Sequence, residues 1–232
     1  MTIKTVCFDV GKTLLTPAIS EAQIVCDAAA TFGAIVDLET VEKSIPAMYE
    51  FYEDAFKRDN SIWGNDAQAV EIWMSLYEYL CGLIGISEVG PQVAKIGYEK
   101  FLDPQSWMLY DDVMPTLSAL KAQGISLGII SNWDSSLDSI IEGLGVSSYF
   151  KVIISSAVVG LYKPQPEIFE LAIRELGAIA HETLFVGDHV DADIRGAARA
   201  GITPILIDRE NRFEDSEEYI RVQNLKDILK YL

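Results

Sequence analysis

The residue that first suggests chemistry is Asp9, which lies in the stretch VCFDVGKTLL at residues 6–15. The apolar, partly β-branched run before it is typical of a buried strand. The carboxylate ends this run, and the chain then turns at once through Gly11, Lys12 and Thr13. Two questions follow: what a bare acid does at the end of a core strand, and why the turn holds a glycine and no second acid.

Polar side chains also follow the later apolar runs of the chain. They are Ser131, Asn132, Lys163, Asp188, Asp191 and Asp193. In an open parallel sheet the ligand binds beyond the carboxyl ends of the strands, so we expect these groups to converge with Asp9. Two unit charges about 4 Å apart repel by roughly 4 kcal/mol at an effective dielectric of about 20. A cation must offset this repulsion, and hard oxygen ligands suit Mg²⁺.

Short apolar runs alternate with helical patterns in the second half of the chain. We expect strands over residues 125–131, 151–155, 183–187 and 204–207, and helices over residues 134–144, 166–176 and 192–200. Glycines follow these helical patterns and indicate where the helices end. The alternation predicts an α/β fold, a doubly wound parallel sheet covered by helices on both faces.

Residues 18–105 have a different character, because long helical patterns run through them without strand-like alternation. We therefore expect a core of residues 1–17 and 106–232, with residues 18–105 inserted as a helical cap domain. The insert is rich in aromatic residues: Tyr49, Phe51, Tyr52, Phe56, Trp63, Trp73, Tyr77 and Tyr79. We expect most of them to form the core of the insert and one or two to line a substrate pocket.

Composition narrows the classes of function. The formal net charge of −17 over 232 residues disfavours nucleic acid as a partner and leaves any anionic substrate dependent on a local positive group or a cation. No run of 18 apolar residues occurs, and we expect no membrane span and no secretion signal. The three cysteines lack metal-ligand spacing, which favours reduced thiols and a cytoplasmic location.

Four motifs in order resemble the haloacid dehalogenase-like (HAD) superfamily, in the branch with a helical cap inserted after the first motif. VCFDVGKTLL resembles motif one, IISN motif two, the lysine of GLYKPQPEIF motif three and VGDHVDADIRGAARAG motif four. The resemblance covers nearly the whole chain. It implies a Rossmann-like core and a Mg²⁺-dependent, phosphatase-type hydrolase that acts on a small phosphorylated metabolite through an aspartyl phosphate.

The resemblance also implies a role for each motif residue. Asp9 would be the nucleophile, and Asp9, Asp188 and the backbone carbonyl of Gly11 would ligate Mg²⁺. Asp193 would hold a lysine that neutralises charge. The residues that would orient Asp9 or contact the phosphoryl group are Thr13, Ser131 and Lys163, with Asn132 and Lys12 as further substrate contacts.

Gly11 departs from the family pattern. Phosphatases of this family carry a second aspartate there, which protonates the leaving oxygen, and usually carry glycine where this chain has Lys12. General acid–base catalysis, worth roughly 10²–10⁴-fold, is therefore missing unless the cap supplies an acid. Of the nearby residues, we expect His189 to be an exposed loop residue and Asp191 a solvated one at a helix start.

Three interpretations of Gly11 remain open. The chain is a slow or specialised phosphatase for acyl, aryl or other good leaving groups, or a catalytically silent metabolite-binding member, or a haloacid dehalogenase or phosphonate hydrolase. Dehalogenases need no metal, so the metal-type pair Gly187-Asp188 counts against dehalogenation.

Overall fold

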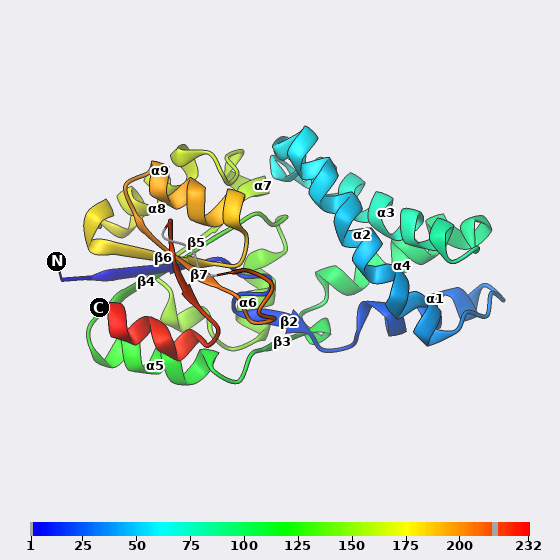
Figure 1. Cartoon of the computed structure of the whole chain (residues 1–232), viewed down its shortest axis with the longest axis horizontal. Coiled ribbons are helices and arrows are strands. Elements are labelled where there is room, and N and C mark those ends of the chain that lie inside the picture. Colours follow the sequence, from blue (N-terminus) through cyan, green and yellow to red (C-terminus); the bar gives the residue numbers. More distant parts are fainter. Residues whose placement is uncertain (1, 215–217) are drawn as a thin grey trace.

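The computed structural model describes residues 2–214 and 218–232. Figure 1 shows a sheet flanked by helices at one end of the molecule and a group of helices, α1 to α4, at the other. Within the described residues, no helix is long and apolar enough to cross a membrane.

A six-stranded parallel sheet forms the centre of the larger part, in the order β5-β4-β1-β6-β7-β8. Its strands are β1 (Thr5–Phe8), β4 (Ser126–Ser131), β5 (Val152–Ser155), β6 (Thr183–Gly187), β7 (Thr203–Ile207) and β8 (Ile220–Val222). β1 pairs with both β4 and β6, so its carboxyl end lies between theirs. The predicted doubly wound parallel sheet is confirmed, with β8 as an additional edge strand.

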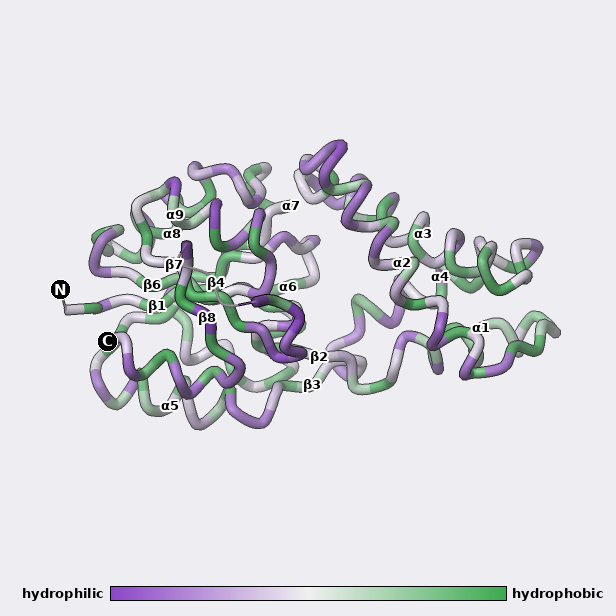
Figure 2. The backbone as a smooth tube through the Cα atoms, in the orientation of Figure 1, coloured by the Kyte–Doolittle hydropathy of each residue, from purple (hydrophilic) through white to green (hydrophobic). Residues whose placement is uncertain are grey.

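Helices cover both faces of this sheet, as expected for strands that are apolar on both sides. They are α5 (Val113–Ala122), α6 (Leu137–Gly143), α7 (Ser156–Val159), α8 (Pro166–Leu176) and α9 (Gly196–Arg199). Cys7 packs in the cluster of α8 and α9, whereas its neighbours Val6 and Phe8 pack in the cluster of α5 and α6. Hydrophobic residues accordingly run along the central strands in Figure 2.

Two expected helices begin differently from the prediction. α6 starts at Leu137 because the side chain of Asp134 accepts the backbone N–H of Ser136 at 2.9 Å, which fixes a turn before the helix. In place of one helix over 192–200, a π-helical turn over Val190–Arg195 precedes α9. There His189 Nδ1 accepts the backbone N–H of Ala192 at 3.1 Å.

Residues 21–102 form what we call the helical unit. Its helices are α1 (Glu21–Thr31), α2 (Leu38–Arg58), α3 (Asp66–Leu83) and α4 (Gly90–Leu102). Ser20, Asp37 and Asn65 accept backbone N–H groups at the starts of the first three helices, as helix N-caps do. The helical unit has its own buried apolar cluster.

The chain enters and leaves the helical unit through two strands that lie side by side. β2 (Leu15–Pro17) and β3 (Trp107–Leu109) pair antiparallel. Short 3₁₀ turns complete the chain at Asn60–Trp63, Ser87–Val89, Pro104–Ser106, Ser147–Tyr149, Ala180–Glu182 and Leu225–Tyr231. The pairing lies at the two boundaries that the sequence predicts for the insert, near residues 17 and 106.

Candidate active site

Asp9 lies just past β1, where its backbone N–H donates to the carbonyl of Val186 at 2.9 Å. The residue is buried, with 7% of its surface exposed. Two donors from other parts of the sheet domain reach the same oxygen: Lys163 Nζ, in the loop after α7, lies 2.6 Å and Ser131 Oγ, at the end of β4, 3.0 Å from Asp9 Oδ1. Three loops thus meet at one carboxylate, as predicted for the carboxyl edge of the sheet.

Lys163 is fully buried between two carboxylates. Its Nζ donates to Asp9 Oδ1 and to Asp193 Oδ1, both at 2.6 Å. Burial alone would lower the pKa of Lys163, but the two carboxylates more than offset this and raise it above its usual value. Lys163 therefore stays positively charged and is held in place. A lysine is seldom buried in a protein core unless acids pair with it.

Asn132 holds the backbone of this lysine. Its side-chain oxygen accepts the N–H of Lys163 at 2.8 Å, and its side-chain nitrogen donates to the carbonyl of Lys163 at 3.0 Å. Asn132 also lines the cavity described below, where we expected a substrate contact. The amide group adds a positioning contact that the sequence did not predict.

Both carboxylate oxygens of Asp193 accept a hydrogen bond. Oδ1 accepts from Lys163, and Oδ2 accepts from the backbone N–H of His189 at 3.0 Å. A Cβ atom on Gly187 would collide with this carboxylate, so the glycine at the end of β6 allows Asp193 to approach the strand. The geometry agrees with the expected role of Asp193 in holding Lys163.

Three acids lie close enough together to hold a cation. Asp9, Asp188 and Asp193 each offer an oxygen within 4.8 Å of the others. Burial, together with the charges of Asp9 and Asp193, raises the pKa of Asp188 to about 7. Both oxygens of Asp193 accept hydrogen bonds, whereas Lys163 and Ser131 both contact the same oxygen of Asp9, so Asp9 and Asp188 are the acids better placed for a metal. Hard carboxylate oxygens under mutual repulsion fit Mg²⁺.

We expect Mg²⁺ to raise the unfolding temperature more at about pH 8 than at about pH 5. Without metal, the folded-state pKa of Asp188 lies above the ordinary value of 3.8. The stability that this raised pKa contributes is therefore complete below about pH 4 and is lost as the pH rises through about 7. Bound Mg²⁺ favours the deprotonated form and offsets the loss. Thermal unfolding with and without Mg²⁺ at both pH values measures the difference.

A pair of asparagine variants supplies the control for that experiment. Asp188→Asn is expected to remove the Mg²⁺ shift. Asp191→Asn is expected to keep it, because the Asp191 side chain is 49% exposed and ion-paired with Arg195. An equal Mg²⁺ shift at both pH values, or one that survives in Asp188→Asn, would contradict the site. The exposure of Asp191 agrees with the solvated role expected for it.

We expected the hydroxyl of Thr13 to hydrogen-bond Asp9, but the structure shows no such bond. Its hydroxyl is buried and has no hydrogen-bond partner among the described residues. The loop is held through the backbone instead: Arg209 Nη2 donates to the carbonyl of Thr13 at 2.7 Å and to Asp112 Oδ1 at 3.0 Å. Arg209 and Asp112 are therefore supports of the Asp9 loop that the sequence analysis missed.

Lys12 points toward the helical unit. Its φ of 55° lies in the left-handed region, which explains why a glycine suits this position. Its Nζ lies 3.7 Å from the ring centroid of Tyr49, whose hydroxyl donates to Glu21 at 2.7 Å. Lys12 lines the cavity, but an aromatic face already contacts its charge.

His189 is not the exposed loop residue that we expected. Its side chain is 22% exposed, and its Nε2 lies 3.3 Å from Glu53 Oε2 of the helical unit. The ring also packs on Phe56, with centroids 5.2 Å apart. No local pattern indicates these contacts of His189, because Glu53 and Phe56 lie more than 130 residues earlier.

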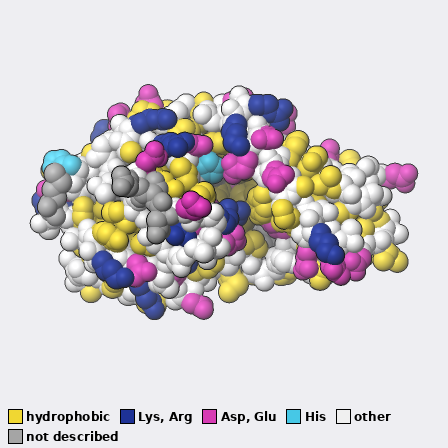
Figure 3. All heavy atoms as spheres, in the orientation of Figure 1, with side chains coloured by type: hydrophobic (Ala, Val, Ile, Leu, Met, Phe, Trp, Pro, Cys, Tyr) yellow, Lys and Arg dark blue, Asp and Glu magenta, His cyan; other side chains and the backbone are white. Residues whose placement is uncertain are grey.

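Other contacts also join the helical unit to the strand ends. Asp66 Oδ1 accepts the backbone N–H of Ser135 at 2.8 Å, and the Tyr98 hydroxyl donates to Asp134 at 2.8 Å. The helical unit is thus closed over the loop that follows β4. Figure 3 shows the hollow that remains between the two parts, with hydrophobic side chains inside it and charged ones at its rim.

The cavity beneath the helical unit has a volume of about 470 Å³ and contains Asp9, Lys163 and Asp188 in its lining. This volume is in the range of small-molecule sites. Aromatic residues form much of the remaining lining: Tyr49, Tyr52, Phe56, Trp63, Trp73, Phe101, Trp107, Trp133 and Phe213. We expected one or two of the eight aromatic residues named for the insert to line the pocket. This expectation is wrong, because five of the eight line it: Tyr49, Tyr52, Phe56, Trp63 and Trp73.

Comparison with known proteins gives a consistent result. Residues 3–201 match the family of haloacid dehalogenase-like hydrolases. Haloacid dehalogenase-like hydrolase domain-containing protein 3 of Danio rerio is 28% identical over 211 residues, which cover 90% of this chain and 86% of that protein. A glyceraldehyde 3-phosphate phosphatase of Methanopyrus kandleri is 37% identical over 114 residues, covering 47% of this chain and 46% of that protein.

A solved structure has the same fold over both parts of the molecule. The HAD phosphatase from Thermococcus onnurineus aligns with 99% of this chain and 97% of its own, with a TM-score of 0.66 and 24% sequence identity. At this identity the likeness concerns the fold alone.

Proposed function

Because the chain belongs to the haloacid dehalogenase-like hydrolases, we propose that it is a Mg²⁺-dependent phosphatase for a small phosphorylated substrate. The observation that carries the proposal is the convergence of Lys163 and Ser131 on one oxygen of Asp9, with Asp188 beside them. The phosphatase name of the Methanopyrus kandleri relative supports the same reaction class.

Asp9 is the nucleophile in this proposal. An oxygen of its carboxylate forms a bond to phosphorus, and the bond between phosphorus and the leaving oxygen breaks, with its electron pair going to that oxygen. Water then attacks the phosphorus of the aspartyl phosphate, which releases phosphate and restores the carboxylate. Gly11 has no side chain to supply a proton in the first step or to accept one in the second.

The residues around Asp9 stabilise charge. Lys163 places a fixed cation against the nucleophile, and Ser131 donates a hydrogen bond to it. Such preorganised groups act where charge develops in the transition state. Asp9, Asp188 and the carbonyl of Gly11 would hold Mg²⁺, which when bound would neutralise charge on the phosphoryl oxygens.

Residues 18–105 act as a cap in this proposal. Opening of the cap would break the polar contacts of Glu53, Asp66 and Tyr98 with the sheet domain. It would also separate Phe56 from His189 and Phe101 from Trp133, and closure would restore these contacts. Closure excludes bulk water from Asp9, and opening admits the substrate.

The proposal predicts that the purified chain hydrolyses a reactive aryl phosphate such as p-nitrophenyl phosphate only when Mg²⁺ is present. The metal requirement follows from the repulsion between Asp9 and Asp188, which a cation must offset. Release of p-nitrophenolate, with Mg²⁺ and with a chelator, measures it. Absence of turnover in protein whose unfolding temperature still responds to Mg²⁺ would instead identify a metabolite-binding protein without catalysis.

A further inference from the structure

The side of Asp9 where an acid is missing is lined by an indole ring. A Cβ atom built on Gly11 would lie 3.6 Å from Cζ3 of Trp133, and no other atom outside the neighbouring residues lies within 4 Å of it. Both residues line the cavity. A leaving group next to Asp9 therefore meets an aromatic surface where a proton donor would otherwise stand.

Trp133 is held firmly in place. Its backbone N–H donates to Ser156 Oγ at 3.1 Å, and its carbonyl accepts from Ser155 Oγ at 2.8 Å. Its ring stacks on Phe101 with centroids 4.6 Å apart and an interplanar angle of 21°, and Trp107 packs against it at 5.2 Å. Its indole N–H donates to Ser136. The ring is thus a preorganised surface rather than an adaptable one.

This surface continues into the helical unit. Trp73 of α3 packs on Phe101 of α4 with centroids 4.3 Å apart, and both rings line the cavity. We call Trp73, Phe101, Trp107 and Trp133 the aromatic wall. Aromatic rings prefer offset-stacked or edge-to-face partners, so the wall favours a flat aromatic guest over a saturated one.

The charged groups of the cavity disfavour a second anionic group on the substrate. Beyond the acids at the strand ends, the lining adds Glu21 and Glu53. The cations there are already engaged: Lys12 contacts the ring of Tyr49, and Arg212 lies 3.5 Å from Asp188. A leaving group with its own phosphate or carboxylate would therefore compete with Asp188 for Arg212 and with the ring of Tyr49 for Lys12, next to the negative charges of Glu21 and Glu53.

We propose that the substrate is the monophosphate ester of an uncharged aromatic hydroxyl compound, with its ring on the aromatic wall and its phosphoryl group at Asp9. This inference rests on the proposed phosphatase function and names the substrate class. It also accounts for Gly11. A phenolic oxygen has a pKa of about 10 as in tyrosine, whereas an alkyl oxygen is close to water at about 16, so aryl oxide leaves with its electron pair and without a proton.

Four phosphates separate the two requirements of this proposal in the full-length protein with Mg²⁺. Phenyl phosphate has an aromatic ring and a good leaving group, benzyl phosphate has the ring only, acetyl phosphate has the leaving group only, and cyclohexyl phosphate has neither. The quantity to compare is kcat/KM, which reports on the first chemical step even when hydrolysis of the aspartyl phosphate limits kcat. We expect phenyl phosphate to exceed both benzyl and cyclohexyl phosphate by roughly 10²-fold or more.

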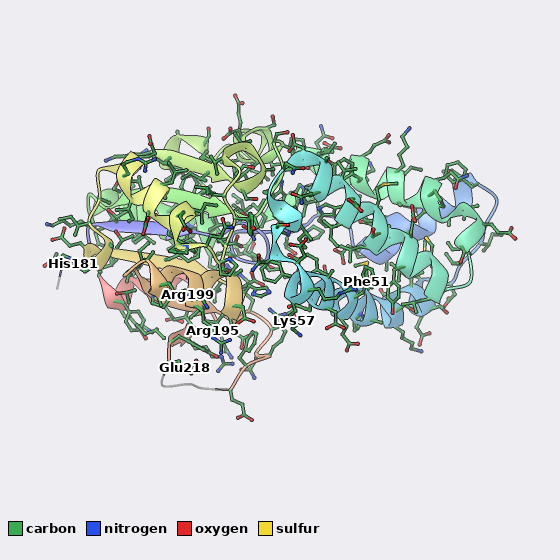
Figure 4. The ribbon with its side chains drawn as sticks, turned by 90° about the horizontal axis from the view of Figure 1, so that it is seen from above. Phe51, Lys57, His181, Arg195, Arg199 and Glu218 are labelled. Atoms are coloured by element: carbon green, nitrogen blue, oxygen red, sulfur yellow. The ribbon has the colours of Figure 1, made fainter. Side chains whose placement is uncertain are left out.

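A binding measurement tests the aromatic wall without turnover. We expect phenylphosphonate to bind at least about tenfold more tightly than cyclohexylphosphonate, because only the flat ring stacks on the wall. Trp133→Leu should remove this preference and lower kcat/KM for phenyl phosphate, while kcat/KM for acetyl phosphate changes little. The matched control is Phe51→Leu, since Phe51, labelled in Figure 4, stacks on Tyr79 of α3 and does not line the cavity.

Each outcome decides for or against the proposal. Equal kcat/KM for phenyl, benzyl and cyclohexyl phosphate would overturn it, as would hydrolysis of acetyl phosphate alone; both results leave the phosphatase function intact. If no phosphate is hydrolysed, the phosphatase function fails and phosphonate affinity decides: equal affinities overturn the aromatic site and a tenfold preference supports it. The substrate panel and phosphonate binding use the unmodified protein, so the test stands even if Trp133→Leu does not fold.

Discussion

Asp9→Asn is expected to abolish hydrolysis of aryl phosphates, with a loss on the order of 10⁴-fold or more in kcat. The amide has the size of the carboxylate but no charged oxygen to attack phosphorus, and it also removes one of the two acids available to Mg²⁺. Lys163 retains its bond to Asp193, so the buried lysine keeps one anionic partner and the variant is expected to fold. Initial rates with phenyl phosphate measure the loss.

Asp27→Asn is the matched control for this substitution. Asp27 lies on the exposed surface of α1 and contacts Gln23 at 2.7 Å, away from the cavity. Asp27→Asn makes the same change of charge as Asp9→Asn and should leave the rate of phenyl phosphate hydrolysis unaltered. If Asp9→Asn turned over phenyl phosphate at the rate of the unmodified protein, Asp9 would not be the nucleophile and the proposed reaction would have to start elsewhere.

The parts of the site that sequence predicted are those that a parallel sheet determines. Strands in register end at one edge, so a polar residue directly after an apolar run is carried there whatever the loops do. Asp9, Ser131 and Asp188 are such residues, and the structure brings all three to one end of the cavity. Lys163 needed the order of the motifs as well, because it follows a loop rather than a strand.

The missed features depend on partners far apart in sequence. Arg209 holds the carbonyl of Thr13 across 196 positions, and no local pattern indicates that pairing. The hydroxyl of Thr13 was likewise expected to hydrogen-bond Asp9, but it has no hydrogen-bond partner among the described residues. The direction in which a helical side chain points is a second cause of missed features. The periodicity of a helix separates a buried face from an exposed one, but it does not say whether the buried face meets other helices or a cavity.

The aromatic residues of the helical unit illustrate this second cause. Trp73 and Tyr77 lie one helical turn apart on α3 and are both shielded from solvent. Trp73 lines the large cavity next to Asp9, whereas Tyr77 does not. The sequence pattern assigns both to the interior and cannot separate them. The proposed substrate class therefore rests on the structure, whereas the proposed reaction class rests on the motifs.

Gly11→Asp is expected to raise kcat/KM for benzyl and cyclohexyl phosphate by roughly 10²-fold, within the 10²–10⁴-fold that a general acid contributes. A Cβ atom fits at this position, because the nearest atom to it is Cζ3 of Trp133 at an ordinary contact distance of 3.6 Å. The φ of Gly11 also lies outside the left-handed region that only glycine favours. Initial rates at saturating Mg²⁺ measure the gain.

Gly11→Ala and Gly11→Asn separate the acid from the mere presence of a side chain. Both add a Cβ beside Trp133, and Asn also reproduces the size of Asp, but neither can give up a proton as Asp does. We expect neither to accelerate the alkyl esters. A gain in Gly11→Asn equal to that in Gly11→Asp would show that packing against Trp133, and not proton transfer, limits the unmodified protein.

The gain in Gly11→Asp should also depend on the leaving group. An acid helps most where the departing oxygen would otherwise leave as an unstable alkoxide and least where it leaves as a phenolate. In Gly11→Asp, kcat/KM for phenyl phosphate should therefore rise much less than kcat/KM for benzyl phosphate. The ratio of the two values should fall accordingly. A uniform gain in kcat/KM across the esters would mean that Asp at position 11 assists the first step in some way other than protonating the leaving oxygen. Help to the later attack of water would raise kcat and leave kcat/KM unchanged. No gain, in a variant that folds and responds to Mg²⁺, would mean that the unmodified protein already takes its proton from another residue.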